Sequence, residues 1–272
     1  MPTIMAKTAL APNVYRLEVD APLVAQRRKP GQFIVLRVNE RAERLPLTIV
    51  DSDPVAGTIT LIFQVLGEGT RLLSMLEIGD EIRDVAGPLG HPTELAYYGT
   101  ALCVGGGIGV APLYPIVEGL VALSNEVTTI VGARTKDLLI LEDDFRKLSS
   151  ELLVTTDDGS YGRHGFVTDA LKDLLGSGSR PGVVVAIGPL PMMRAVAEVT
   201  RPYEIRTVVS LNPIMVDGTG MCGGCRVTVN GELRFACVDG PEFDAHKVNF
   251  AELANRQRMY RDHEQCKIRS LI

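Results

Sequence analysis

The feature that most constrains the fold is a glycine-rich turn between an apolar strand and a helix. The run Ala101–Val104 is apolar, four of the next five residues (105–109) are glycine, and a helical pattern extends from about Ala111 to Leu123. Strand-like and helix-like segments then alternate, which predicts a doubly wound parallel sheet. The strands expected after the turn are Val127–Val131, Leu152–Thr155, Val183–Ile187 and Arg206–Leu211, and the helices are Asp144–Lys147, Gly165–Leu174 and Met193–Thr200.

The residues before this region have short apolar segments separated by glycine and proline, which predicts a small antiparallel β-barrel. After residue 210, two short strands flank Asn230-Gly231, a strong signal for a hairpin, and a polar helix is expected at Asn249–His263. We therefore predict a barrel at residues 1–97, an α/β domain at 98–210 and a C-terminal segment at 211–272. The expected barrel strands are Val14–Val19, Gln32–Val38, Leu45–Val50, Thr58–Val65 and Asp80–Asp84.

Charge and hydropathy argue against several classes of protein. The 272-residue chain has a formal net charge of −5 and no block of basic residues, which argues against a nucleic-acid partner. No apolar run reaches the roughly 18 residues of a membrane span, and the N-terminus has no apolar signal-peptide core. We expect a cytoplasmic protein with no membrane association, and in such a compartment clustered cysteines indicate a metal site rather than disulfides.

Three of the five cysteines lie in one segment with the spacing of an iron–sulfur site. The order Asp217, Cys222, Cys225 and Cys237 gives the pattern D-x4-C-x2-C-x11-C. Plant-type ferredoxins hold a [2Fe–2S] cluster with C-x4-C-x2-C and a distant fourth cysteine, so here an aspartate takes the place of the first cysteine. Its carboxylate is the natural candidate for the fourth ligand. Glycines at 218, 220, 223 and 224 suit a loop whose amides turn toward cluster sulfurs.

Two alternatives stay open for this segment. A CxxC pair with a further cysteine and a carboxylate also suits a structural zinc knuckle, although zinc sites commonly pair two knuckles and the next histidine is His246. Cys266 is a second candidate for the missing ligand. We interpret Cys266 as a free thiol because it lies beyond the expected helix, and Cys103 as a core residue because it lies in an apolar strand.

The glycine-rich turn predicts a nucleotide site, although a purely structural turn is the alternative. Its glycines allow the backbone to approach a pyrophosphate, and Pro112 suits a first helical turn, where its missing N–H has no partner. Arg134 follows the next strand, where a ribose or its 2′-phosphate is expected. Lys136 adds positive charge there and Asp137 tempers it, so the choice between NAD and NADP stays open, with a slight preference for NAD(H). The residues expected at this nucleotide are Gly105, Gly106, Gly107, Gly109, Pro112, Arg134 and Asp157.

Several short motifs resemble those of the ferredoxin–NADP reductase superfamily. The stretch Arg44–Ile49 resembles its flavin-contacting R-x-[YP]-[ST] motif, with Leu47 inserted before the hydroxyl. Gly67–Arg71 offers helix-start amides and a hydroxyl to a flavin pyrophosphate, and Gly87–Gly90 resembles the G-P-x-G turn. Gly188–Met193 resembles the segment that flanks the nicotinamide. The resemblance implies FAD contacts from Arg44, Pro46, Leu47, Thr48, Gly67, Gly69 and Thr70, and nicotinamide contacts from Gly188, Pro189 and Met192.

In its order of barrel, nucleotide domain and cysteine segment, nearly the whole chain resembles one group of electron-transfer subunits. These are the electron-transfer subunits of class 1B dihydroorotate dehydrogenases and, more closely, the small subunits of NADH-dependent ferredoxin:NADP oxidoreductases. Asp217 separates the two, because the dihydroorotate relatives carry cysteine there, and the run Cys237–Asp244 also resembles the second type.

The resemblance implies FAD, a [2Fe–2S] cluster and NAD(H) or NADP(H) as cofactors of a heterodimeric oxidoreductase. Hydride is exchanged between the nicotinamide and FAD, and single electrons pass through the cluster to a larger flavin and iron–sulfur subunit. That complex serves ferredoxin, and members of this group bifurcate electrons. No acid–base catalytic residue is assigned in this chain. The alternatives are the electron-transfer half of a dihydroorotate dehydrogenase, disfavoured by Asp217, and a zinc-stapled nucleotide-binding module.

Overall fold

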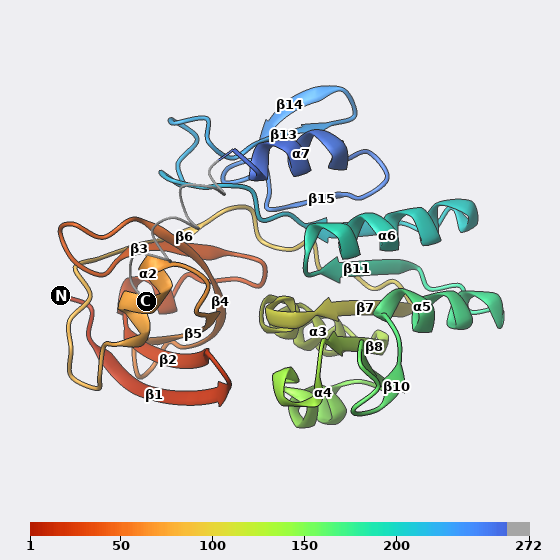
Figure 1. Ribbon diagram of the computed structural model, residues 1–272, viewed down its shortest axis with the longest axis horizontal. Helices are drawn as coiled ribbons and strands as arrows, with labels where there is room; N and C mark the ends of the chain where they lie inside the picture. Colours follow the sequence, from red (N-terminus) through yellow and green to blue (C-terminus); the bar gives the residue numbers. More distant parts are fainter. Residues whose placement is uncertain (260–272) are drawn as a thin grey trace. The chain divides into compact units, whose positions relative to one another are not determined.

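The computed structural model describes residues 1–259, which form two compact units (Figure 1). The barrel unit contains residues 1–92, 212–241 and 249–259, and the α/β unit contains residues 93–211 and 242–248. The chain therefore passes between the units four times, at 92/93, 211/212, 241/242 and 248/249. The cysteine segment belongs to the barrel unit. The division into three parts with boundaries at 97/98 and 210/211 stays a prediction.

Antiparallel strands build the barrel unit. Its sheet contains, in this order, β1 (Ile4–Ala11), β2 (Val14–Asp20), β5 (Thr58–Gln64), β4 (Leu45–Asp53), β3 (Phe33–Arg37) and β6 (Asp84–Leu89). The two edges of this sheet are joined, because the segment before β6 is hydrogen-bonded to the start of β1. The Ile4 N–H donates to the Asp80 carbonyl at 3.0 Å, and the Ile82 N–H donates to the Pro2 carbonyl at 2.8 Å. These bonds close the expected barrel. Two short helices, α1 (Pro22–Ala25) and α2 (Glu68–Ser74), connect strands.

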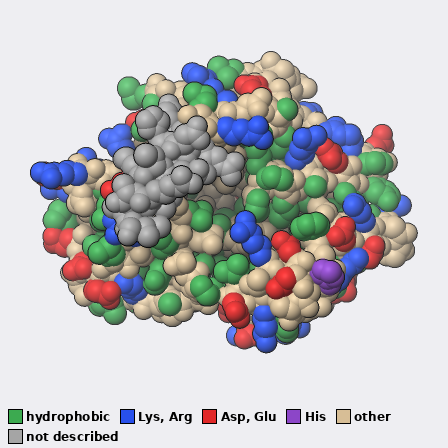
Figure 2. Space-filling view, in the orientation of Figure 1, with side chains coloured by type: hydrophobic (Ala, Val, Ile, Leu, Met, Phe, Trp, Pro, Cys, Tyr) green, Lys and Arg blue, Asp and Glu red, His purple; other side chains and the backbone are tan. Residues whose placement is uncertain are grey.

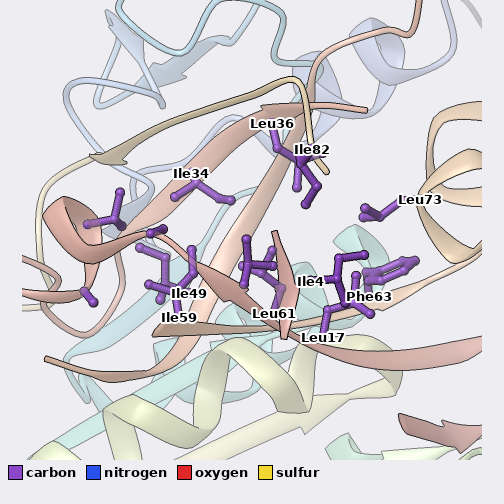
Figure 3. Packing of buried hydrophobic residues seen from close by; sticks show 14 of the residues in the cluster. Ile4, Leu17, Ile34, Leu36, Ile49, Ile59, Leu61, Phe63, Leu73 and Ile82 are labelled. Atoms are coloured by element: carbon purple, nitrogen blue, oxygen red, sulfur yellow. The ribbon is translucent and has the colours of Figure 1, made fainter. Parts of the chain in front are cut away.

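Alternate side chains of these strands fill the inside of the barrel (Figure 3). Leu17 and Val19 on β2, and Ile59 and Leu61 on β5, have no exposed surface, as expected for the inward positions of strands. Burial of one such side chain contributes about 1.5–3 kcal/mol, more than the roughly 1 kcal/mol of an average hydrogen bond. The barrel is therefore held mainly by this core. Figure 3 also labels Ile4, Ile34, Leu36, Ile49, Phe63, Leu73 and Ile82.

Two barrel strands differ from the sequence prediction. The last strand covers Asp84–Leu89 instead of Asp80–Asp84, and it includes Gly87-Pro88, which the motif presents as a turn. β6 is an edge strand that pairs with β3 across a register shift, and glycine and proline are tolerated at such edges and bulges. The sequence does not predict β1, because only its first residue, Ile4, is buried and no apolar alternation results.

A mostly parallel sheet forms the centre of the α/β unit. It contains, in this order, β10 (Arg163–His164), β9 (Glu151–Thr156), β8 (Glu126–Ala133), β7 (Thr100–Gly106), β11 (Val183–Ile187), β12 (Thr207–Ser210) and β15 (Glu242–Asp244). Only the β12–β15 pair is antiparallel among these described strands. The strand order reverses between β7 and β11, which confirms the doubly wound sheet. In such sheets ligands bind beyond the carboxyl ends of the strands at this point.

Helices cover both faces of this sheet. They are α3 (Val110–Ala122), α4 (Glu142–Leu148), α5 (Val167–Gly176) and α6 (Leu190–Thr200), with short 3-10 turns η1 (Gly107–Gly109), η2 (Lys136–Leu138) and η3 (Arg201–Tyr203). In Figure 1, α3 and α4 lie on one face, and α5 and α6 lie on the other. β11 is buried along its whole length, as expected for a strand covered on both faces. The sequence does not predict β10 and β15, because two or three residues are too short to carry a pattern.

The predicted hairpin of the cysteine segment is present in the barrel unit. β13 (Arg226–Val229) pairs with β14 (Glu232–Phe235), and Asn230 and Gly231 between them have φ angles of 53° and 77°. Both central residues of a type I′ turn need positive φ, which is the reason for the Asn-Gly signal.

The C-terminal helix α7 (Phe250–Gln257) begins after Asn249, and the end of the predicted helix at His263 lies outside the described residues, as does Cys266. Within residues 1–259, no helix is both long enough and apolar enough to cross a membrane. On the face shown in Figure 2, basic and acidic side chains are interspersed rather than gathered by sign. This distribution agrees with the lack of a basic block in the sequence.

Candidate functional site

The glycine-rich turn lies at the carboxyl edge of the parallel sheet, where β7 leads through η1 into α3. A Cβ at Gly109 would lie 2.4 Å from the carbonyl oxygen of Ile187, so a side chain is excluded there. Gly107 has a φ of +55° and nothing within 4 Å of its Cβ position. The turn therefore packs closely against the end of β11 and is open at Gly107. Pro112 lies in the first turn of α3, as predicted.

The turn and the segment after β11 come together, although the sequence presents them as separate motifs. A Cβ at Gly106 would lie 2.4 Å from Sδ of Met192 and 3.3 Å from Cδ of Pro189. A Cβ at Gly188 would lie 2.7 Å from Cε of Met192 and 3.1 Å from the carbonyl oxygen of Gly106. These four predicted residues form one surface at the point where the strand order reverses.

The ends of β8 and β9 place charged residues next to one another. The Asp157 N–H donates to the Ala133 carbonyl at 3.0 Å, and the Asp158 N–H donates to the Arg134 carbonyl at 3.2 Å. The Asp158 carboxylate accepts hydrogen bonds from the hydroxyl and the N–H of Ser160 at 2.7 and 3.0 Å, and these bonds lower the pKa of Asp158. Arg134 and Asp157, which are both expected at the nucleotide, thus lie at neighbouring strand ends. Asp158 lies beside these two residues, although only Asp157 is predicted at the nucleotide from the sequence.

In the barrel unit, the arginine motif lies against the Gly-x-Gly-Thr motif. A Cβ at Gly69 would lie 2.7 Å from Cδ2 of Leu45 and 2.7 Å from Oε1 of Glu43, the two residues that flank Arg44. β4 begins at Leu45 and carries the rest of the motif, with Thr48 opposite Phe33 of β3. The two predicted groups of flavin residues therefore meet. Pro46 and Leu47 lie on β4 between Leu45 and Thr48.

The amides at the start of α2 are already hydrogen-bonded within the chain. The hydroxyl oxygen of Thr70 accepts from the N–H groups of Leu66 and Gly67 at 3.0 and 3.1 Å. The Glu43 carboxylate accepts from the Gly69 N–H at 3.0 Å. A carboxylate oxygen thus occupies a donor that the sequence assigns to a phosphate. Glu43 was missed, because the 26 positions between it and Gly69 leave no local pattern.

Two cysteine sulfurs lie close together at one end of the β13–β14 hairpin. The Sγ atoms of Cys225 and Cys237 are 3.1 Å apart, and both residues are buried. The Cys237 N–H donates to Cys225 Sγ at 3.4 Å, and the Gly224 N–H donates to the exposed Cys222 Sγ at 3.4 Å. Burial, followed by the hydrogen bond with Cys225, raises the pKa of Cys237 to about 12, whereas the Gly224 amide lowers the pKa of Cys222.

The carboxylate of Asp217 is hydrogen-bonded within its own loop. The Thr219 N–H donates to Asp217 Oδ2 at 3.0 Å, and the Thr219 hydroxyl donates to the same oxygen. These bonds, with a smaller contribution from the positive charge of Arg44, lower the pKa of Asp217. Across residues 1–259, no three His, Cys, Asp or Glu side chains are arranged as a metal-binding group. Ligation by Asp217 therefore stays a prediction.

The donor set nevertheless fits an iron–sulfur cluster. Backbone amides point at two sulfurs, which is how proteins stabilise thiolates around such clusters. Gly218, Gly220 and Gly223 have φ angles of 82°, 87° and 65°, as the sequence predicts, whereas Gly224 does not have a positive φ. A Cβ at Gly218 would lie 2.8 Å from Val35 of β3, so the loop packs directly on the barrel.

Comparisons with known proteins agree with this geometry. Residues 212–249 match the family model of the iron–sulfur cluster binding domain of dihydroorotate dehydrogenase B, and residues 103–198 match that of the oxidoreductase NAD-binding domain. A Thermotoga maritima homologue of the electron transfer subunit of dihydroorotate dehydrogenase B (NAD(+)) is 47% identical over 96% of this chain and 92% of its own length. The chain belongs to the family of dihydroorotate dehydrogenase B electron-transfer subunits and their homologues.

One further relative and one solved structure extend the comparison. The electron transfer subunit of dihydroorotate dehydrogenase B from Geobacillus thermodenitrificans is 37% identical over 90% of this chain and 96% of its own length. A solved structure of an NADH-dependent reduced ferredoxin-NADP oxidoreductase, described for flavin-based electron bifurcation, has a TM-score of 0.94 and 45% identity. That likeness covers 100% of this chain and 98% of the other.

Family and fold confirm the predicted cofactors, which are FAD, an iron–sulfur cluster and a nicotinamide nucleotide. The protein is an electron-transfer subunit of the oxidoreductase type. The match to an iron–sulfur domain favours that interpretation of the cysteines over a zinc knuckle. The assignment of individual residues to each cofactor stays a prediction.

Proposed function

We propose that this electron-transfer subunit is part of an NAD(P)H:ferredoxin oxidoreductase. It takes reducing equivalents from NAD(H) and passes single electrons to a larger flavin and iron–sulfur subunit, which bifurcates them and serves ferredoxin. The observation that carries the proposal is Asp217 in an otherwise intact C-x4-C-x2-C frame. The full-length likeness to the ferredoxin-NADP oxidoreductase structure supports it. A cytoplasmic location belongs to the same proposal.

In the α/β unit, the open side of the glycine-rich turn binds the nucleotide pyrophosphate. The surface of Gly106, Gly188 and Met192 orients the nicotinamide, because the two glycines let Met192 pack directly against the turn at the point where the strand order reverses. Asp157 and Asp158 put negative charge where the adenosine ribose is expected. Together with Asp137, these carboxylates outnumber the cations Arg134 and Lys136 in the same place, so we propose a preference for NAD(H) over NADP(H).

In the barrel unit, the guanidinium of Arg44 pairs with the flavin pyrophosphate, and β4 presents Pro46, Leu47 and Thr48 to the ring. Gly67, Gly69 and Thr70 lie at the start of α2, where their donors exchange their present hydrogen bonds within the chain for the pyrophosphate when FAD binds. FAD and the cluster, when bound, convert two-electron transfer into single-electron transfer. A Cβ at Gly218 would lie 2.8 Å from Cγ2 of Val35, the residue that pairs with Pro46 of β4, which supports a flavin motif beside the cysteine loop. Asp217, Cys222, Cys225 and Cys237 are proposed to hold the [2Fe–2S] cluster.

The experiment is anaerobic purification of the protein with its partner, followed by visible spectroscopy and iron analysis. We expect flavin bands and a broad iron–sulfur absorption that bleaches with NADH. Asp217→Ala should lose iron, and Cys266→Ala should keep it. A colourless zinc-containing protein, or iron loss only in the Cys266 variant, would contradict the assignment.

A second candidate is the electron-transfer half of a dihydroorotate dehydrogenase, which the sequence identities to such subunits favour. The partner that co-purifies distinguishes the two. A larger subunit that exchanges electrons with ferredoxin supports the first proposal, whereas a subunit that oxidises dihydroorotate supports the second.

A further inference from the structure

Glu242 is a carboxylate at the edge of the parallel sheet that the proposed function does not use. It is the first residue of β15 and pairs in register with Ser210 of β12. Its Oε1 accepts a hydrogen bond from the Thr93 hydroxyl at 2.5 Å, across 149 positions of sequence. Both residues belong to the α/β unit.

Thr93 and Glu242 occupy equivalent places in the chain. Each is the first residue of the α/β unit after the chain leaves the barrel unit, one at the 92/93 passage and the other at 241/242. Two residues earlier, the His91 N–H donates to the Gly240 carbonyl at 2.7 Å. The two entering segments are thus paired twice, first by backbone and then by side chains. The second segment comes from Cys237, five positions before Glu242.

No cation neutralises this carboxylate among the described residues. The charged and titratable groups around it are Tyr98 before β7, Glu94 beside Thr93, Arg206 before β12 and Asp244 on β15. Arg206 pairs with other groups, since its guanidinium donates to Glu94 at 2.8 Å and lies over the Tyr98 ring at 5.6 Å. Burial raises the pKa of Glu242 to about 7, and the Thr93 hydroxyl offsets only part of that effect.

We propose that Thr93 and Glu242 form a protonation-controlled latch that fastens β15 beside β12 where the chain enters the α/β unit. The protonated carboxyl of Glu242 stays buried at little cost in free energy. The ionised carboxylate gains hydration when β15 separates from β12, so ionisation favours opening. In the opened strand the carboxyl has an ordinary pKa near 4.5. Opening therefore becomes easier by about tenfold for each pH unit between roughly 5 and 7, and its free energy is constant above that range.

The test is amide hydrogen exchange on the full chain with its cofactors, corrected for the intrinsic pH dependence of exchange. The reporter amides are Ala245, whose N–H donates to the Thr207 carbonyl at 2.8 Å, and His91. We expect the protection factors of both amides to fall about tenfold per pH unit between roughly 5 and 7 and then to level off. Amides of β7 report global opening, which also releases Glu242 and therefore shares this dependence, so a local latch requires that Ala245 and His91 exchange faster than the β7 amides at every pH.

Variants make the test specific. Glu242→Gln cannot ionise, so protection should no longer depend on pH, and Thr93→Val should lower protection at every pH. Glu94→Gln is the matched control, since this glutamate neighbours Thr93 but pairs with Arg206, and it should keep the wild-type dependence. The latch is refuted if wild-type protection is the same at pH 5 and pH 7, or if the dependence survives in Glu242→Gln.

Discussion

At the scale of single residues, the nucleotide turn depends on one glycine that has no room for a side chain. Gly109→Ala would place a methyl group 2.4 Å from the Ile187 carbonyl oxygen, which is backbone and cannot rotate away. We expect a loss of about 1–3 kcal/mol in stability and a larger loss in NAD(H) affinity, with FAD retained. Thermal unfolding and NADH titration measure both. Gly176→Ala, where the Cβ position is open, is the control, and equal effects of the two changes would contradict the argument.

A second residue-scale prediction concerns Glu43, whose carboxylate holds the amide of Gly69. If that amide binds the flavin pyrophosphate, the carboxylate competes with it and also repels it. Glu43→Gln should therefore raise FAD affinity by about fivefold, equivalent to roughly 1 kcal/mol. Glu40→Gln removes the same charge from an exposed neighbour that pairs with Arg83, and it should have little effect. Flavin fluorescence during titration of the flavin-free chain measures the affinity, and equal gains in both variants would show a general charge effect.

At the scale of secondary structure, helix α2 is fastened at its carboxyl end by a lysine from β1. The ammonium of Lys7 donates to the carbonyls of Ser74 and Leu76 at 2.9 and 2.8 Å and pairs with Glu77 at 2.7 Å. Lys7→Met should cost about 1–3 kcal/mol, because two carbonyls lose a charged donor. Lys172→Met breaks only an exposed pair and should cost less than about 0.5 kcal/mol. Urea unfolding of the full chain measures both costs, and equal costs would contradict this role.

A polar network joins α6, β12 and the loop after β15. The Thr207 hydroxyl donates to Thr200 Oγ1 at 2.7 Å, and Thr200 Oγ1 lies 2.9 Å from His246 Nε2. Burial, followed by the charge of Arg201, lowers the pKa of His246 below its usual 6.5. The unfolded chain therefore binds a proton first as pH falls, and stability is lost below about 6.5.

His246→Gln should remove this dependence. We expect the stability difference between wild type and variant to shrink as the pH falls from 7.5 to 5.5, measured by urea unfolding at each pH. The difference between wild type and variant is needed because Glu242 gives the free energy of unfolding a pH dependence of the opposite sign, which is the same in both proteins. Its raised pKa makes stability fall as pH rises from about 4.5 to 7. A constant difference across the range would show that His246 does not titrate as argued.

At the scale of the whole molecule, sequence reasoning succeeds where the physical demand is local. Gly109 and the Asn230-Gly231 turn are predictable because backbone geometry permits few other residues there. The contacts of Glu43 with Gly69, and of Thr93 with Glu242, join distant positions and leave no trace in spacing. β15 is missed for the same reason, since its three residues become a strand only beside β12.

The last prediction concerns electron flow through the whole subunit. If the sulfurs of Cys222, Cys225 and Cys237 hold the cluster, Cys225→Ala should lose most of the iron and keep FAD. NADH oxidation with a two-electron dye should then continue near the wild-type rate, because the nucleotide and flavin residues are untouched. Electron delivery to the partner subunit should fall to background. Stopped-flow spectroscopy of the complex separates the two rates.

Cys103→Ala is the matched control for this change. Cys103 and Cys225 are both buried, at 0% and 1% exposure, so removal of either sulfur leaves a similar cavity. Cys103 lies on β7 in the core of the parallel sheet, where burial raises its pKa to about 12 and keeps the thiol neutral. This variant should keep both iron and electron delivery. Equal losses in the two variants would attribute the effect to stability, and unchanged delivery in Cys225→Ala would remove the cysteine segment from the electron path.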